Sequence, residues 1–380
     1  MSDNLEELIK LRQELHQHPE LSGEEKNTAN RIKAFLAQYA PDETIEGVGG
    51  TGLLFVYNGK EPGSTVVIRS ELDALPIQEV NEMAYQSKVA GVSHKCGHDG
   101  HMVMVAGLAA YLKRNRPQSG KVILLFQPAE ETGEGAERMI SDPVFQKLGF
   151  DYFFALHNLP GYPTNQIVMR EGTFASASQG LIVRLEGKTS HAAEPENGNS
   201  PALAMAKIVE KWHSLSNKTL PLSEFAIVTV VHAQLGTKAF GVSPGHAHIM
   251  ATLRAYNDDD LTKLTEEASG FAKRIAEKYR LKIAFEKTEV FAATTNSEKC
   301  QKIISDAVQK NGFDSVVRAE PFRWSEDFGL FTKKYEGAMF GLGAGIDCPD
   351  LHNPDYDFPD QIISTGLKMF ESIIDQIVNK

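Results

Sequence analysis

Residues 64–76 read STVVIRSELDALP, and this stretch decides the fold class. Its apolar run, Val66–Ile68, lacks polar alternation, which is typical of a strand covered on both faces of a parallel sheet. The run KVILLFQPAEE at 121–131 is a second strand of this kind and is ended by Pro128. Between them, HMVMVAGLAAYLKRN at 101–115 is typical of a buried helix. Strands that alternate with helices predict an α/β fold with a mostly parallel sheet.

The N-terminal segment is predicted to form two helices. Residues 4–18 carry apolar side chains at helical spacing, and a second helix is expected over 22–39. Ser22 and Glu25 have the spacing of a capping box at the start of that second helix. The isolated histidines His16 and His18 are expected to be surface or capping residues.

The pattern changes near residue 179. From there the chain has the order strand, helix, strand, strand, helix, strand, which is the ferredoxin-like βαββαβ unit. We expect residues 179–290 to form an inserted domain that interrupts a larger α/β domain made of 1–178 and 291–380. The expected elements of the insert cover 181–187, 200–217, 225–235, 246–255, 258–279 and 281–290.

Composition excludes several classes of protein. The net charge of −11 argues against a nucleic-acid surface, which needs clustered Lys and Arg. No window reaches the ~20 apolar residues of a membrane helix. The N-terminus lacks the pattern of a secretory signal, so the cytoplasm is the expected location. The three cysteines are too few and too widely spaced for a disulfide framework, which leaves Cys96 a free thiol.

Polar residues gather where the predicted strands end. Ligands bind beyond the carboxyl ends of the strands in open α/β sheets, so these groups are expected to converge on one rim. The segment SHKCGHDGHM at 93–102, just before the buried helix, adds a cysteine and three histidines. The strand-end residues are Glu71, Asp73, Glu130, Glu131, His157 and His352.

The residues alone leave several kinds of site open. Glu130 and Glu131 could be a solvated loop, and Asp99 could be only a helix N-cap. Cys96 could be a nucleophile with a histidine base, whereas a structural zinc site would need four closely paired Cys or His ligands. A mixed set of S, N and O ligands suits zinc, manganese, nickel or cobalt. Five such ligands, one of them bridging, suit two divalent ions.

The chain resembles one family in seven motifs, between about residues 10 and 375. This is the family of dinuclear metallo-amidohydrolases and metallopeptidases that includes hippurate hydrolase, N-acetyldiaminopimelate deacetylase, bacterial aminoacylases and plant auxin-conjugate hydrolases. CGHDGH together with PAEE is its most specific combination. The motifs, in order, are ELDALPI, HKCGHDGHM, QPAEETGEGAERMI, LHNLP, GKTSHAAEP, SEDFG and GLGAG followed by LHNP.

The resemblance implies two divalent metal ions held by the larger, catalytic domain. Cys96 matches the cysteine that bridges the ions. His98 and His157 match the ligands of one ion, and Glu131 and His352 match those of the other. His94 and His101 are then expected to be structural or to orient ligands, with Asp99 capping the helix or orienting a ligand.

The resemblance also implies roles around the metals. Glu130 matches the general base, and Asp73 matches an acid that orients a ligand. His191 matches a histidine of the inserted lid and dimerisation domain that stabilises the oxyanion, in some relatives from the partner subunit. Arg254 aligns with an arginine that helps to hold the substrate carboxylate. Gly241 stands where relatives have a substrate-binding asparagine, which predicts a shifted specificity.

The implied activity is hydrolysis of N-acyl amino acids, a small-molecule amide substrate, by a metal-activated water. A dipeptidase or aminopeptidase on the same scaffold is the first alternative. A metal-free thiol hydrolase using Cys96 is the second, and a non-catalytic binding protein is the third, although a pure binder would not need Glu130. Glu71, where relatives have Asp, is a departure of one methylene. The resemblance favours a homo-oligomer, either a dimer or a tetramer.

Overall fold

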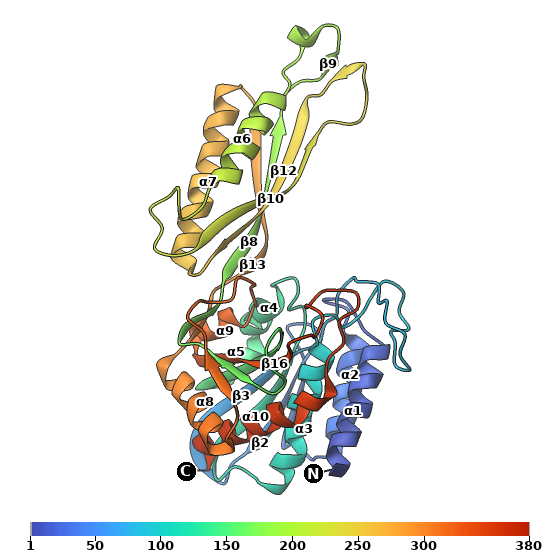
Figure 1. The fold of residues 1–380 in the computed structure, drawn as a ribbon, viewed down its shortest axis with the longest axis vertical. Helices are drawn as coiled ribbons and strands as arrows, with labels where there is room; N and C mark the ends of the chain where they lie inside the picture. Colours follow the sequence, from blue (N-terminus) through green and yellow to red (C-terminus); the bar gives the residue numbers. More distant parts are fainter. Residues whose placement is uncertain (1, 380) are drawn as a thin grey trace. The chain divides into compact units, whose positions relative to one another are not determined.

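The structure, a computed structural model, describes residues 2–379, which form two compact units. The first unit comprises 2–174, Thr294–Pro321 and 326–379, and the second comprises Ala175–Ala293 with Phe322–Ser325. Figure 1 colours the chain from blue to red along its length. Within the described residues, no helix is long and apolar enough to cross a membrane.

The described part of the first unit is built on one eight-stranded sheet with the order β1-β2-β4-β3-β5-β16-β6-β15. Its four central strands, β4, β3, β5 and β16, are parallel, whereas β2 pairs antiparallel with both β1 and β4. The predicted mostly parallel α/β fold is therefore confirmed. The strands are β1 Glu43–Val48, β2 Gly52–Asn58, β3 Glu61–Glu71, β4 Ser119–Gln127, β5 Tyr152–Pro160, β6 Ile167–Met169, β15 Ser315–Val317 and β16 Glu336–Gly345.

Helices cover both faces of this sheet, which explains the continuous apolar runs (Figure 1). Val66 and Ile68 of β3 belong to the core shared with α1, α2, α3, α8 and α10. On the opposite face Phe153 of β5 stacks on Phe331 of α9. The helices are α1 Ser2–Gln17, α2 Lys26–Ala37, α3 His98–Arg114, α4 Gly135–Ser141, α5 Pro143–Gln146, α8 Glu298–Asn311, α9 Gly329–Lys334 and α10 Ile363–Val378, with the 3₁₀ turn η2 Asp360–Ile362.

The predicted capping box of α2 is wrong. The helix begins at Lys26, and the side chain of Glu25 makes no cap hydrogen bond to it among the described residues. Ser22 instead donates to Oδ2 of Asp73 at 2.7 Å. Glu25 is fully buried and accepts hydrogen bonds from Thr51 and from the backbone of Ala129. Both side chains therefore hydrogen-bond residues distant in sequence and do not cap the helix.

The prediction that His16 is a surface or capping residue is also wrong. His16 is fully buried, and its two ring nitrogens lie 2.8 Å from Asp99 Oδ2 and 2.9 Å from Glu79 Oε1. His18, which follows the end of α1, is half-buried. A buried imidazole between two carboxylates ties α1 to α3 and to the loop after β3.

The second unit confirms the ferredoxin-like order. As described, its antiparallel sheet has the strand order β10-β12-β8-β13, and α6 and α7 pack on one face. Trp212 Nε1 donates to the Ala268 carbonyl at 3.0 Å and links the two helices. Its elements are β8 Ala177–Glu186, β9 Ser190–His191, η1 Pro195–Asn197, α6 Ala202–Ser214, β10 Ala226–Leu235, β11 Val242–Ser243, β12 His246–Ala255, α7 Asp258–Lys278 and β13 Lys282–Phe291. A separate pair, β7 Gly172–Ala175 and β14 Thr294–Asn296, lies where the chain passes between the units.

Candidate active site

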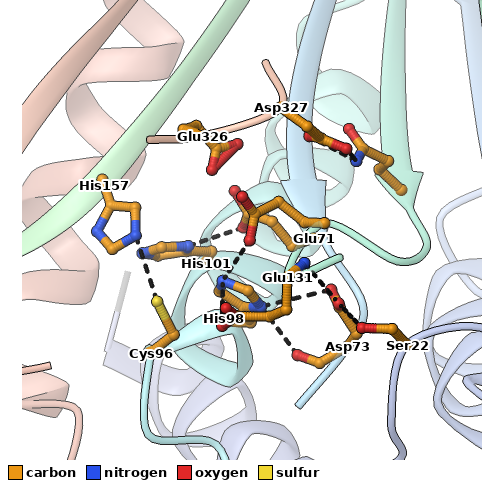
Figure 2. Close-up of polar contacts among 12 residues, drawn as sticks. Ser22, Glu71, Asp73, Cys96, His98, His101, Glu131, His157, Glu326 and Asp327 are labelled. Atoms are coloured by element: carbon orange, nitrogen blue, oxygen red, sulfur yellow. Dashed lines mark hydrogen bonds and ion pairs between the residues drawn. The ribbon is translucent and has the colours of Figure 1, made fainter. Parts of the chain in front are cut away.

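The polar strand ends converge on one rim of the first unit. Glu71 is the last residue of β3, Glu130 follows β4, and His157 lies near the end of β5. The loop after β16 supplies His352, and α3 supplies His98 as its first residue. These strands are parallel, so their carboxyl ends meet at the same edge of the sheet, and Figure 2 shows most of the side chains gathered there.

The start of α3 is fixed by Gly97 rather than by Asp99. Gly97 is the N-cap and has a φ of 87°, a conformation that glycine adopts readily and L residues adopt rarely. A Cβ there would lie 2.7 Å from Asn158 Nδ2 and 2.8 Å from the Tyr356 hydroxyl. The predicted capping role of Asp99 is wrong, because its buried carboxylate binds Arg12 and His16 instead.

Two groups of potential metal ligands share one residue. Ligand atoms of Cys96, His98 and His157 lie within 4.8 Å of one another, and so do those of Cys96, Glu131 and His352. All five residues were expected at the site, and the structure brings all five together. The overlap at Cys96 has the arrangement that a bridging thiolate between two ions would need.

His98 and His157 each point the Nε2 atom of the ring toward this cluster. Nδ1 of His98 donates to the Asp73 carbonyl at 2.8 Å, and Nδ1 of His157 donates to the Asn158 carbonyl at 2.8 Å. Nε2 of His157 then lies 3.5 Å from the Cys96 sulfur. Nε2 of His98 is buried and has no hydrogen-bond partner among residues 2–379. Backbone carbonyls thus select the tautomer in which Nε2 is unprotonated, the form of the ring nitrogen that binds a metal.

His352 is held in place through its backbone. Its N–H donates to the Lys95 carbonyl at 2.8 Å, next to Cys96, and its φ is 67°. Its Nε2 lies 3.8 Å from Oε2 of Glu131. The strained, left-handed backbone of a non-glycine residue is common where a function requires an exact side-chain position.

The turn that carries Glu130 and Glu131 is held by two buried carboxylates. Glu25 accepts the N–H of Ala129 at 2.8 Å, and Oδ2 of Asp73 accepts the N–H of Glu131 at 3.0 Å. Ala129 itself has a φ of 51°. Nε2 of His98 lies 3.8 Å from an oxygen of each glutamate. Glu130 is only 4% exposed, which excludes the solvated-loop alternative.

The electrostatics of the cluster fit a cation site. Burial raises the pKa of the Cys96 thiol, and the carboxylate of Glu131 raises it further. Burial also raises the pKa of Glu131 to about 7. Burial and the carboxylates of Glu326 and Glu131 raise the pKa of Glu130. Acids crowded in this way keep their protons unless positive charge is supplied, and the mixed S, N and O donors suit a divalent transition metal.

The other two histidines of the 93–102 segment do not join either group of three around Cys96. His101 has both nitrogens engaged, because Nδ1 lies 2.8 Å from Glu71 Oε2 and Nε2 accepts from Asn158. His94 is buried, and neither of its nitrogens has a hydrogen-bond partner in the part of the chain that the structure describes. His101 thereby ties Glu71 to β5, which agrees with its expected structural role.

Sequence reasoning missed a buried ion-pair group next to Glu130. Arg69 of β3 forms ion pairs with three carboxylates, those of Glu71, Glu326 and Asp327. Two sequence signals were available, namely an arginine inside an apolar strand and the motif SEDFG, which carries Glu326 and Asp327. Neither signal indicates the partner, because Arg69 and Asp327 are 258 positions apart.

Comparison with known proteins identifies the family. The model of "Peptidase family M20/M25/M40" matches residues 67–376. The chain belongs to peptidase family M20/M25/M40. This confirms the resemblance found in the motifs.

Two relatives and one solved structure match the chain over almost its whole length. N-acetyldiaminopimelate deacetylase of Lactobacillus helveticus is 29% identical over 375 residues, with 97% of both chains covered. N-acetylcysteine deacetylase of Bacillus subtilis is 29% identical over 371 residues, with 96% of this chain and 95% of the relative covered. The crystal structure of the Bacillus subtilis YXEP protein, described as a dinuclear metal-binding peptidase of the M20 family, has a TM-score of 0.85 and 26% identity, covering 100% and 99% of the two chains.

Three further residues that were expected to act in catalysis or substrate binding, namely His191, Gly241 and Arg254, lie in the second unit. His191 and Val242 pair across the short β9–β11 sheet, and the Gly241 carbonyl accepts the N–H of Ala192 at 3.0 Å. Nδ1 of His191 accepts the N–H of Ala193 at 3.1 Å, so a neutral ring carries its proton on Nε2. Arg254 Nη1 donates to the Arg323 carbonyl and to Ser325 Oγ, within the same unit.

Proposed function

We propose that this protein is a metal-dependent amidohydrolase that cleaves the amide bond of N-acyl amino acids. The observation that carries the proposal is the pair of ligand groups that share Cys96, with the carboxyl of Glu130 beside them. The family match supports it, and so do two relatives whose names describe deacetylation of N-acetylated amino acids.

Two divalent ions per chain are the cofactors that this arrangement favours. His98 and His157 would hold one ion, Glu131 and His352 the other, and Cys96 both. The YXEP protein, a relative in fold, is described as binding a dinuclear metal. Manganese, zinc, nickel and cobalt all accept such mixed ligands. When bound, such ions supply Lewis acidity and lower the pKa of water to near neutrality.

The protein's own residues would move the proton. Glu130 accepts a proton from the attacking water and delivers it to the leaving nitrogen. Asp73 holds the backbone of Glu131 and, through its carbonyl, the ring of His98. His191 offers an Nε2–H donor, which is the group that an oxyanion requires. We propose that this histidine acts from its own or from the partner subunit.

We propose that two residues of the second unit, Arg254 and Gly241, determine which substrate is bound. Arg254 is proposed to bind the substrate carboxylate, and Gly241 removes the amide that relatives present. We therefore propose a shifted acyl-group or amino-acid preference, with a dipeptide or aminopeptidase substrate as the second candidate. A panel of N-acyl amino acids and dipeptides, assayed with manganese, zinc and nickel, tests this. Ordinary turnover of hippurate and N-acetyl amino acids would contradict a shifted specificity.

Chelation separates the metal mechanism from a thiol mechanism. His157 lies 3.5 Å from Cys96, as in a Cys–His hydrolase, but burial raises the pKa of the thiol and disfavours a free thiolate. We expect EDTA to abolish turnover and added metal to restore it. Full activity in EDTA, together with loss of activity on alkylation of the thiol, would favour the thiol hydrolase. Glu130→Ala with wild-type turnover would remove the proposed base.

We also propose that the protein is a homo-oligomer and that it is located in the cytoplasm. Strands β10 and β13 are the edges of the second unit's sheet, and edge strands can pair across a two-fold axis. The three cysteines are free thiols, which suits a reducing compartment. Light scattering would distinguish a dimer from a tetramer. If His191 acts in trans, a forced monomer should lose turnover while it retains its metals.

A further inference from the structure

A buried carboxyl group that the proposed mechanism leaves unused lies beside Glu130. Glu326 is 1% exposed, and its carboxyl group lies beside that of Glu130. Carboxylate oxygens of Glu130, Glu326 and Asp327 lie within 4.8 Å of one another. Figure 2 shows Glu326 and Asp327 on one short segment close to the ligand cluster. Burying three acids together is costly unless each has a partner.

Arg69 is the partner that fixes this group. Its Nη1 lies 2.6 Å from Oε1 of Glu326, and its Nη2 donates to Asp327 at 2.8 Å. Its Nε donates to the side-chain oxygen of Gln127 at 2.9 Å. All three guanidinium nitrogens are thus engaged, and the planar fork allows little movement. Arg69, a residue of β3, therefore fixes the position of the Glu326 carboxyl group.

The two neighbouring acids differ in what they have left to offer. The carboxylate of Asp327 accepts from Arg69, from Gln127 Nε2 at 2.7 and 2.8 Å, and from the N–H of Ala136 at 2.9 Å. Its lone pairs are used by the surrounding fold. Glu326 forms an ion pair with Arg69 and lies next to the carboxyl group of Glu130. Asp327 is therefore structural, whereas Glu326 connects the fold to the proposed base.

We propose that Glu326 is a positioning residue for Glu130, a role that rests on the function proposed above. Arg69 holds Glu326, and Glu326 holds the carboxyl of Glu130 in the orientation that faces the metal ligands. A glutamine at 326 keeps the length of the side chain and can donate an amide hydrogen to Glu130, whereas an alanine can do neither. Comparing Glu326→Gln with Glu326→Ala therefore tests whether a side chain that reaches and hydrogen-bonds Glu130 is required at this position.

Steady-state kinetics of the metal-loaded full chain, with the best substrate found in the panel of N-acyl amino acids and dipeptides, test the proposal. We expect Glu326→Ala to lower kcat by about 100-fold, the scale of a misplaced general base, with KM changed by less than about threefold. Metal content per chain and melting temperature should stay close to wild type, because Arg69 keeps Glu71 and Asp327. Glu326→Gln should recover kcat to within about tenfold of wild type. Glu320→Gln, an exposed glutamate on the same connection, is the control and should change nothing.

A double-mutant cycle shows whether Glu326 acts through Glu130. In a Glu130→Asp background the base is already displaced, so Glu326→Ala should lower kcat by less than about threefold. Three results would overturn the inference: an alanine variant with wild-type kcat, a glutamine variant no better than alanine, or equal losses in both backgrounds. Glu130→Ala with wild-type turnover would instead overturn the proposed function, and the inference with it. The failures of the two proposals are therefore distinguishable.

Discussion

The carboxylate of Glu25 accepts a hydrogen bond from the backbone N–H of Ala129 at 2.8 Å, across 104 positions of sequence. The same carboxylate accepts from Thr51 and from the N–H of Gly23. It thereby holds the turn that presents Glu130 and Glu131. The sequence places Glu25 at the start of a helix, but the fold uses it to support the rim.

Glu25→Gln is expected to loosen this turn. A neutral amide oxygen accepts hydrogen bonds from the N–H groups of Gly23 and Ala129 more weakly than a carboxylate does, at a cost of about 1–3 kcal/mol. The midpoint of chemical unfolding should fall, and metal affinity should weaken because Glu131 is less well fixed. Glu24→Gln, on the exposed neighbour, is the control. Equal stability and equal metal affinity for the two variants would contradict the support role.

Protein stability should depend on His16 above neutral pH. Burial alone would lower the pKa of His16, but its hydrogen bonds to Asp99 and Glu79 raise it to about 9 from an ordinary value of 6.5. The stabilisation from the charged ring is complete below pH 6.5 and is lost as pH rises through about 9, in total ~3 kcal/mol. Melting curves from pH 6 to 10 should show this loss for wild type and not for His16→Gln. Parallel curves for the two proteins would refute it, and His18→Gln should behave as wild type.

Gly97→Ala should be clearly destabilising. The new Cβ would contact Asn158 and Tyr356 at under 3 Å, and the φ of 87° adds backbone strain. Gly91→Ala is a matched control, because Gly91 has a φ of 76° and its Cβ would meet no described atom within 4 Å. Urea unfolding should show a loss of about 1 kcal/mol for the control, from backbone strain alone, and of several more for Gly97→Ala. Similar losses at the two positions would show that steric contact is unimportant.

Gly241→Asn should restore the substrate preference of the relatives. A Cβ at 241 would meet no described atom within 4 Å, so the side chain can be added without strain. We expect KM for N-acetyl amino acids to fall several-fold, about the effect of one added hydrogen bond, with unchanged melting temperature. Lys238→Asn, an exposed position on the same loop, is the control. An unchanged KM would remove Gly241 from the specificity proposal.

The rim could be predicted from sequence, whereas its supports could not. Parallel strands bring their carboxyl ends together whatever the side chains are, so the meeting of Asp73, Glu131 and His157 followed from the pattern of strands. The partners of Ser22, His16 and Arg69 depend on packing between segments far apart in the chain. Local signals such as the capping box gave the wrong partner there, because buried carboxylates competed for the same groups.

Metal content per chain tests the central claim most directly. If Cys96 bridges two ions, the purified wild-type protein should bind two divalent ions per chain, and Cys96→Ala should lose both. His352→Ala should lose one, and Cys348→Ala, a free cysteine outside both ligand groups, should keep two. Two ions retained by Cys96→Ala, or no metal in the active wild-type protein, would contradict the account.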